Sequence, residues 1–157
     1  MSIHPGQQAP DFKLYNSAKQ EIELSAQKGK NVVLLFFPLA FTSTCTAELC
    51  HIRDNYARYN SLNATVFGIS VDSLFSLGKF REEQQLNFDL LSDFNKTVSA
   101  AYGSLYETFG FGMHGVSKRS AFVIDSEGIV RYAEVLEKAG DQPNYGAIVN
   151  CLEGLGR

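Results

Sequence analysis

The sequence predicts an α/β fold in which a central mixed β-sheet is flanked by helices. Short, continuous apolar runs, of which residues 32–37 are the clearest, are typical of strands covered on both faces. Elsewhere apolar residues recur every three or four positions, as they do in amphipathic helices. With 157 residues, of which 45% are hydrophobic, the chain can build one substantial core. We therefore expect a single domain over residues 1–157.

The chain opens with two short segments that we expect to pair as an N-terminal hairpin. Residues 11–15 alternate polar and apolar side chains, as a half-exposed strand does, and residues 21–24 form a second short strand. The polar residues 16–20 between them supply the turn. The buried strand at residues 32–37 comes next, and we expect it to end at Pro38, because proline has no N–H for the ladder.

A helix that carries Cys45 is expected to follow this strand. Thr42 or Ser43 can cap its start through a side-chain oxygen, and the helix should run to about residue 60. Its apolar positions recur at spacings of three and four, and they are Leu49, Ile52, Tyr56 and Tyr59. Cys45 thus lies in the first turn, where amide N–H groups and the macrodipole stabilise a nucleophilic thiolate. The same positive helix end favours the acidic Glu48.

The rest of the chain repeats strand and helix and closes with a second hairpin. The expected elements are a strand over 64–71, a helix from Asp72 or Ser73, a short strand over 87–93, a helix over 97–102 that stops at Gly103, antiparallel strands over 120–125 and 129–135, and a terminal helix to about residue 155. This element order is that of a thioredoxin-like α/β fold with an N-terminal hairpin.

Residues 110–115 satisfy the pattern G-x-G-x-x-G, which in other proteins binds dinucleotides. That fingerprint needs a strand before it and a helix after it, so that backbone amides point at the pyrophosphate. Here a helix precedes the pattern and a strand follows it. We therefore interpret the segment as a flexible loop that bears aromatic residues.

Composition and charge argue against several kinds of function, namely nucleic-acid binding, membrane association and metal binding. The net charge is −3, with 14 basic and 17 acidic residues, and no block of like charge suggests nucleic acid as a partner. No secretory signal is evident, and every apolar run is far short of the ~20 residues that span a bilayer, so we expect a cytoplasmic protein with no membrane partner. The 3 cysteines neither make a disulfide framework nor have zinc-ligand spacing, so we expect reduced thiols and no metal.

The segment after the buried strand reads Pro38-x-x-x-Thr42-x-x-Cys45 and resembles the active-site motif of the peroxiredoxins. Residues 9–12, Ala-Pro-Asp-Phe, are similar to the opening of many members of that family. The resemblance implies a thiol-dependent peroxidase in which Cys45 attacks the O–O bond of hydrogen peroxide or an organic hydroperoxide and becomes a sulfenic acid. It also implies that the Thr42 hydroxyl and the Cys45 N–H hold the peroxide oxygens. Pro38 would shield the sulfenic acid from water, and Glu48 would support the site from behind.

The family also uses a distant arginine, for which Arg119 is the candidate. Residues 119–128 look like the arginine-bearing strand of the peroxiredoxins. Lys118 competes for the role on charge alone, but a guanidinium stays charged and offers a planar fork for two oxygens, which an ammonium cannot. His51 and His114 are interpreted as ordinary polar residues, because a thiolate needs no separate base. The reaction likewise needs no cofactor.

The sequence allows two routes by which the Cys45 thiol is regenerated after oxidation. Cys50 follows Cys45 at the spacing of the resolving cysteine in many members of the PrxQ (bacterioferritin comigratory protein) subgroup, which form an intramolecular disulfide. In an intact helix this spacing gives about 7.5 Å of rise and about 140° of rotation, whereas a disulfide prefers Cα atoms ~4.4–6.8 Å apart. The first turns must therefore unwind on this route, and a thioredoxin-like protein is the expected reductant of the disulfide.

The alternative is a cycle with one cysteine. Residues 36–42 are similar to the active-site lead-in of the AhpE-like peroxiredoxins, whose best-known members work in this way. Cys50 would then be an ordinary apolar side chain that packs the helix against the core. A low-molecular-weight thiol or a thioredoxin-like protein would attack the sulfenic acid of Cys45 directly. Cys151 matches no motif and is interpreted as structural.

Other functions share the fold or the chemistry. A thiol–disulfide oxidoreductase would use a C-x-x-C pair, which this sequence lacks, whereas a peroxide sensor would relay the oxidation of Cys45 to a partner protein. A non-catalytic binding module predicts no rapid reaction of Cys45 with peroxide. The oligomeric state is open between a monomer and an A-type homodimer packed near the active site. Its candidate contacts are the aromatic residues Phe41, Phe109 and Phe111.

Overall fold

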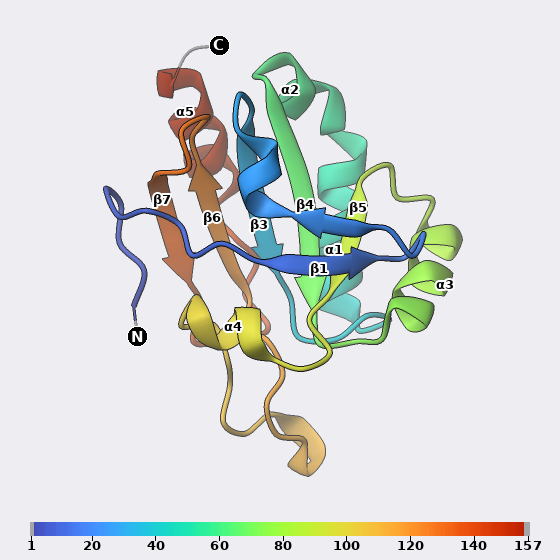
Figure 1. Ribbon diagram of the computed structural model, residues 1–157. Helices are drawn as coiled ribbons and strands as arrows, with labels where there is room; N and C mark the ends of the chain where they lie inside the picture. Colours follow the sequence, from blue (N-terminus) through green and yellow to red (C-terminus); the bar gives the residue numbers. More distant parts are fainter. Residues whose placement is uncertain (1, 156–157) are drawn as a thin grey trace.

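A seven-stranded mixed β-sheet runs through the computed structural model, which describes residues 2–155 (Figure 1). Its strands are β1 (Lys13–Asn16), β2 (Glu21–Glu23), β3 (Asn31–Phe36), β4 (Ala64–Ser70), β5 (Asp89–Ser92), β6 (Ser120–Ile124) and β7 (Val130–Val135). The spatial order is β2-β1-β5-β4-β3-β6-β7. Strand β4 pairs in parallel with β3 and β5, and every other pair is antiparallel. The predicted mixed sheet with an N-terminal hairpin is confirmed.

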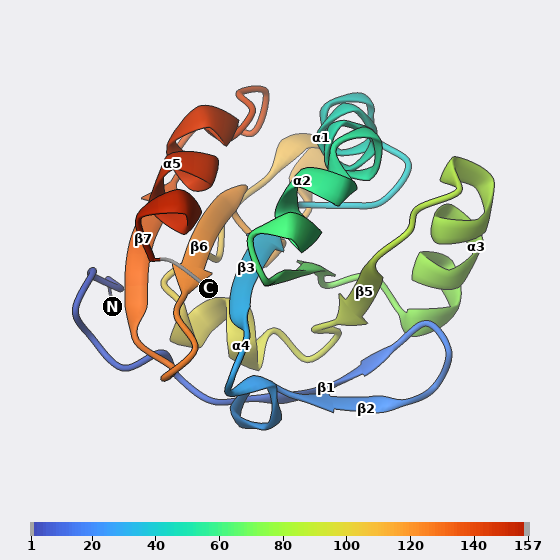
Figure 2. The ribbon, with the colours of Figure 1, turned by 90° about the horizontal axis from the view of Figure 1, so that it is seen from above.

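Helices cover both faces of this sheet. They are α1 (Ser43–Asp54), α2 (Tyr56–Ser61), α3 (Leu74–Gln84), α4 (Thr97–Ala101) and α5 (Tyr145–Leu155), with short 3-10 turns η1 (Leu24–Gln27) and η2 (Gly110–Gly112). Figure 2 shows α1, α2 and α5 on one face, and α4 with the β1–β2 hairpin on the other. None of these helices is both long enough and apolar enough to cross a membrane.

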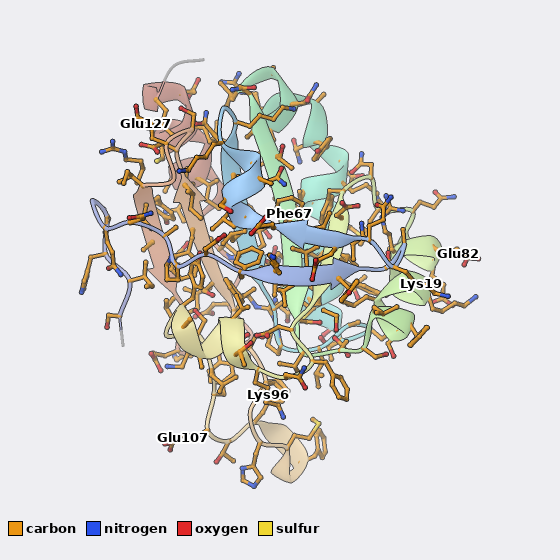
Figure 3. The ribbon with its side chains drawn as sticks, viewed as in Figure 1. Lys19, Phe67, Glu82, Lys96, Glu107 and Glu127 are labelled. Atoms are coloured by element: carbon orange, nitrogen blue, oxygen red, sulfur yellow. The ribbon has the colours of Figure 1, made fainter. Side chains whose placement is uncertain are left out.

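Strand β3 divides the core because its side chains alternate between the two faces. Val33 and Leu35 pack under α1, α3 and α5, whereas Leu34 and Phe36 pack under the hairpin and α4. Phe67 of β4 lies on this second side, beneath the hairpin (Figure 3). Burying each such side chain stabilises the fold by about 1.5–3 kcal/mol. The strand that leads to Cys45 is therefore held firmly from both sides.

The single helix predicted up to about residue 60 is wrong, because the chain breaks it at Asn55. This residue leaves the helical region at φ −114° and ψ 13°, and its side-chain amide donates to the carbonyl of His51 at 2.8 Å. The break divides the segment into α1 and α2. Apolar spacing continues across the break because Ile52 of α1 and Tyr59 of α2 face the same core, so the pattern did not reveal it.

An arm formed by residues 104–118 projects from the sheet between α4 and β6 (Figure 1). It is a narrow hairpin in which Leu105 pairs with Ser117 and the Phe109 N–H donates to the Met113 carbonyl at 2.7 Å. The Lys96 side chain lies against Gly115 near the base of the arm, and Glu107 lies on its outer side (Figure 3). The G-x-G-x-x-G pattern thus forms a loop with one 3-10 turn, as the order of its neighbouring elements predicted.

Candidate active site

The loop between β3 and α1 is anchored by Asp72, which lies just after β4. Its Oδ2 accepts the Ala40 N–H at 2.8 Å and the Ser70 hydroxyl at 2.6 Å. The Phe41 backbone takes a left-handed φ of 70°, and its ring packs edge-on against Phe80 of α3 at 5.1 Å between centroids. Sequence reasoning gave Asp72 only as a helix start. No local pattern shows that the Asp72 carboxylate binds Ala40, which lies 32 positions earlier in the sequence.

Replacing Asp72 with alanine is expected to lower the free energy of unfolding by about 1.5–3 kcal/mol, the usual cost of losing hydrogen bonds to a charged acceptor. Urea unfolding measures this change. Hydrogen exchange of the Ala40 amide should become faster at the same time, because that N–H loses its acceptor. The exposed Asp141 supplies a matched control, and Asp141→Ala should leave both quantities unchanged. A variant D72A with an unaltered Ala40 exchange rate would show that the loop is held by other contacts.

Thr42 stands at the N-cap position of α1 but does not cap the helix with its hydroxyl. Its backbone is extended, with φ −84° and ψ 154°, and its Oγ1 donates to the Leu39 carbonyl at 2.8 Å. The predicted side-chain cap from Thr42 or Ser43 is therefore wrong, because a nearer carbonyl takes the Thr42 hydroxyl and Ser43 is already inside the helix. The first amides of α1 receive no side-chain cap, so their partial positive charge stays at the end of the helix that carries Cys45.

Cys45 is the third residue of α1, and its side chain is fully buried. The Sγ atom accepts a hydrogen bond from Nη2 of Arg119 at 3.2 Å, across 74 positions of the sequence. A guanidinium and a helix N-terminus both stabilise negative charge on the sulfur. Both groups lie where a nucleophilic sulfur needs them.

Arg119 is fixed from three sides just before β6. Besides the Cys45 sulfur, its Nη1 donates to Oε1 of Glu48 at 2.7 Å, and its Nε donates to the Ala139 carbonyl at 3.0 Å. The backbone carbonyl of Arg119 accepts the Leu136 N–H at 2.9 Å. The guanidinium can therefore hardly rotate, and the residue is also only 1% exposed to solvent. This immobility is what a group that positions a reacting oxygen requires.

Tyr106 of the arm supports this arrangement, and sequence reasoning did not find it. Its hydroxyl donates to the Leu136 carbonyl at 3.0 Å and so holds the segment that binds Arg119. Lys118 lies outside, with its Nζ 3.2 Å from Oε1 of the exposed Glu137 and 5.8 Å from the centre of the Tyr106 ring. Of the two basic neighbours, Arg119 is the one that contacts Cys45.

Glu48 is completely buried on α1, and its position differs from the expected one. It was expected to interact with the positive end of the helix, but it lies beyond the first turn and forms an ion pair with Arg119 instead. Its second oxygen, Oε2, has no hydrogen-bond partner among the described residues. Burial raises the pKa of Glu48 to about 7, although Arg119 acts to lower it.

The other cysteines lie apart from this cluster. Cys50 is half-buried later in α1, and its Sγ contacts Oε1 of Gln84 in α3 at 3.5 Å. Cys151 is half-buried in α5, where burial raises the pKa of its thiol. His51 stacks on Tyr145 at 3.8 Å, and Nδ1 of His114 lies 3.0 Å from the Glu107 carbonyl on the arm.

A fully buried thiol at the start of a helix, held by a fixed guanidinium on a mixed sheet with helices on both faces, defines a thiol-dependent peroxidase of thioredoxin-like fold. The chain belongs to the AhpC/TSA family, whose pattern it matches over residues 5–133. It is therefore an enzyme of the peroxiredoxin class.

Known proteins agree with this assignment in sequence and in structure. The chain is 39% identical to the peroxiredoxin Bcp of Bacillus subtilis over 130 residues, which cover 82% of each chain. The crystal structure of the peroxidoxin BcpB from Mycobacterium tuberculosis superposes with a TM-score of 0.86 at 31% identity and covers 99% of both chains. The bacterioferritin comigratory protein of Xanthomonas campestris gives a TM-score of 0.81 at 25% identity, covering 91% of this chain and 90% of that protein. The thioredoxin-like fold predicted from the element order is confirmed.

Proposed function

We propose that Cys45 is the peroxide-reacting thiol of this enzyme, with hydrogen peroxide and organic hydroperoxides as substrates. The observation that carries the proposal is the 3.2 Å hydrogen bond from the immobile Arg119 to the buried Cys45 sulfur. The Xanthomonas campestris relative is described by its alkyl peroxide reduction activity, which fits a site that admits organic hydroperoxides. In the reaction the sulfur attacks one peroxide oxygen, so an S–O bond forms while the O–O bond breaks.

The neighbouring residues have distinct parts in this step. Arg119 stabilises the charge that develops on the two peroxide oxygens, because its guanidinium is already fixed beside the Cys45 sulfur where the reaction occurs. The Thr42 hydroxyl gives its hydrogen to Leu39, so its oxygen is left to accept the O–H of the peroxide. Pro38 is buried in the loop between β3 and α1 and helps to keep water from the sulfenic acid. Glu48 holds Arg119 in place by accepting a hydrogen bond from its Nη1.

Cys50 then resolves the sulfenic acid as an intramolecular disulfide, which a thioredoxin-like protein reduces. Helix α1 is continuous through both cysteines, so the bond forms only after the first turns unwind. Unwinding removes the fully buried Leu49 from the core and separates Cys50 from Gln84. This local opening is part of the proposed cycle.

One equivalent of hydrogen peroxide is expected to convert the reduced protein to a Cys45–Cys50 disulfide. Rapid alkylation and peptide mapping by mass spectrometry identify the product. The variant Cys50→Ser should stop at the sulfenic acid of Cys45, whereas the matched variant Cys151→Ser should behave as wild type, since Cys151 lies on α5. Absence of any modification at Cys45 would refute the peroxidase proposal.

The cycle with one cysteine remains the second candidate because a specific observation favours it. Cys50 is held against Gln84 in an unbroken α1, a geometry that leaves the sulfenic acid of Cys45 to an external thiol. Sulfenic acid that persists equally in wild type and in Cys50→Ser would establish this cycle.

The partner surface and compartment are further parts of the proposal. Phe41 is 52% exposed and Phe111 is fully exposed, so both rings are available to a second copy in an A-type homodimer. Analytical ultracentrifugation distinguishes this dimer from a monomer.

The three free thiols fit the reducing conditions of the cytoplasm.

A further inference from the structure

Two acidic groups share one guanidinium at the active site. Arg119 donates through Nη1 to Glu48 and through Nη2 to Cys45, at 2.7 Å and 3.2 Å. Cys45 and Glu48 are 0% exposed, and Arg119 is 1% exposed. The three side chains therefore form one cluster that is shielded from water, and a net charge on such a cluster is energetically costly.

The total charge of this cluster limits its protonation states. A guanidinium with a thiolate and a carboxylate carries a net charge of −1, which burial strongly disfavours. A neutral cluster requires one proton on the two acidic groups together, either on the sulfur or on the carboxyl. When Cys45 is the reactive thiolate, the proton is on Glu48. Oε2 of Glu48 has no partner within residues 2–155, which agrees with this state, since an orphaned oxygen costs less on a neutral carboxyl than on a carboxylate.

Burial and the nearby carboxylate of Glu134 favour the protonated form of Glu48, whereas Arg119 acts against it. The titratable groups near Glu48 are Cys45 on α1, Tyr59 on α2, Glu134 on β7, Tyr145 on α5, and Arg119 before β6. Only Arg119 is cationic. The carboxylate of Glu134 is held in place by the Asn144 N–H and the Tyr132 hydroxyl, both at 3.0 Å. Together with burial it acts against ionisation of Glu48, whose pKa of about 7 leaves it protonated below neutrality.

We propose that Glu48 carries the proton that neutralises the leaving oxygen when the O–O bond breaks, an inference that rests on the proposed function of Cys45. In net terms, the Cys45 thiolate, hydrogen peroxide and the Glu48 carboxylic acid give the Cys45 sulfenic acid, water and the Glu48 carboxylate. The S–O bond forms, the O–O bond breaks, and the hydroxide released takes the proton. The cluster is neutral before and after the step, because Arg119 passes from the pair with the thiolate to the pair with the carboxylate.

The test compares two oxidants that differ in their need for a proton. Hydrogen peroxide releases hydroxide, whereas peracetic acid releases acetate, a weak base that needs none. In Glu48→Gln the rate of Cys45 oxidation by hydrogen peroxide near pH 6 should fall about 100-fold, the usual size of a general-acid contribution. The rate with peracetic acid should stay within about threefold of wild type, because glutamine keeps an oxygen acceptor for Arg119.

Wild-type protein supplies a second measurement that needs no variant. Its rate with hydrogen peroxide should decline as the pH rises through about 7, where Glu48 loses its proton, while the rate with peracetic acid should not. Glu137→Gln is the matched control: it removes a carboxylate that pairs with Lys118, and it should change neither rate.

Equal losses with both oxidants in Glu48→Gln would overturn the proposal, because a residue that only positions Arg119 affects both reactions alike. Unchanged rates with both oxidants would overturn it as well. Failure of Cys45 to react with either oxidant in the wild-type protein is a different result, and it would refute the proposed function itself.

Discussion

Arg119→Lys is expected to slow the oxidation of Cys45 by hydrogen peroxide by about 100-fold to 1000-fold, as removal of one fixed oxyanion donor does in other enzymes. Arg119 reaches the Cys45 sulfur, a Glu48 oxygen and the Ala139 carbonyl with three different nitrogens of one plane. An ammonium keeps the charge but has a single nitrogen, so it cannot hold these positions and also receive two peroxide oxygens.

Single-turnover oxidation, quenched by alkylation and followed by mass spectrometry, measures this rate. The chain has no tryptophan, so its intrinsic tryptophan fluorescence cannot report the reaction. Lys118→Met is the matched control, since Lys118 is the adjacent cation but pairs with Glu137 outside the cluster. It should stay within about threefold of wild type. A wild-type rate in Arg119→Lys would mean that positive charge alone is sufficient at this position.

The parts of the site that the sequence predicted are those that local patterns encode. The buried run of β3, the proline after it and the helix with Cys45 in its first turn all lie within one stretch of chain. Periodicity and composition are enough to define such elements. The identity of Arg119 came instead from a family resemblance, because no local pattern links it to a sulfur 74 positions earlier.

The parts that the sequence did not predict depend on contacts between distant segments. The ion pair of Glu48 spans 71 positions, and the anchor from Asp72 to Ala40 spans 32. Tyr106 supports the Arg119 segment through the Leu136 carbonyl, a contact that no sequence pattern can indicate. The break at Asn55 was missed for another reason, since both helices keep their apolar faces on one core. Tertiary packing decides the first three of these features, whereas the break at Asn55 is local.

Breaking the buried ion pair is expected to cost more stability than any surface change. Arg119→Met leaves the acidic pair of Cys45 and Glu48 buried without its cation, and removal of one partner from a buried ion pair typically costs about 3–5 kcal/mol. Urea unfolding at neutral pH measures this loss. Arg58→Met is the matched control, because the Arg58 pair with Glu153 is exposed at both ends and should be worth less than about 1 kcal/mol.

The double variant Glu48→Leu/Arg119→Met separates the cost of an unpaired charge from the worth of the pair. It should be more stable than Arg119→Met alone, since two apolar side chains leave no charge in the core.

A pH series adds an independent check on Glu48. Burial raises the pKa of this carboxyl from 4.5 to about 7, so the folded state holds more protons than the unfolded state between these values. Its contribution to stability is therefore complete below pH 4.5 and is lost as the pH rises through about 7. The difference in unfolding free energy between wild type and Glu48→Gln should change in favour of the variant across that window. A difference that stays constant would mean that Glu48 is already ionised in the folded protein, and that the cluster around Arg119 holds a net negative charge.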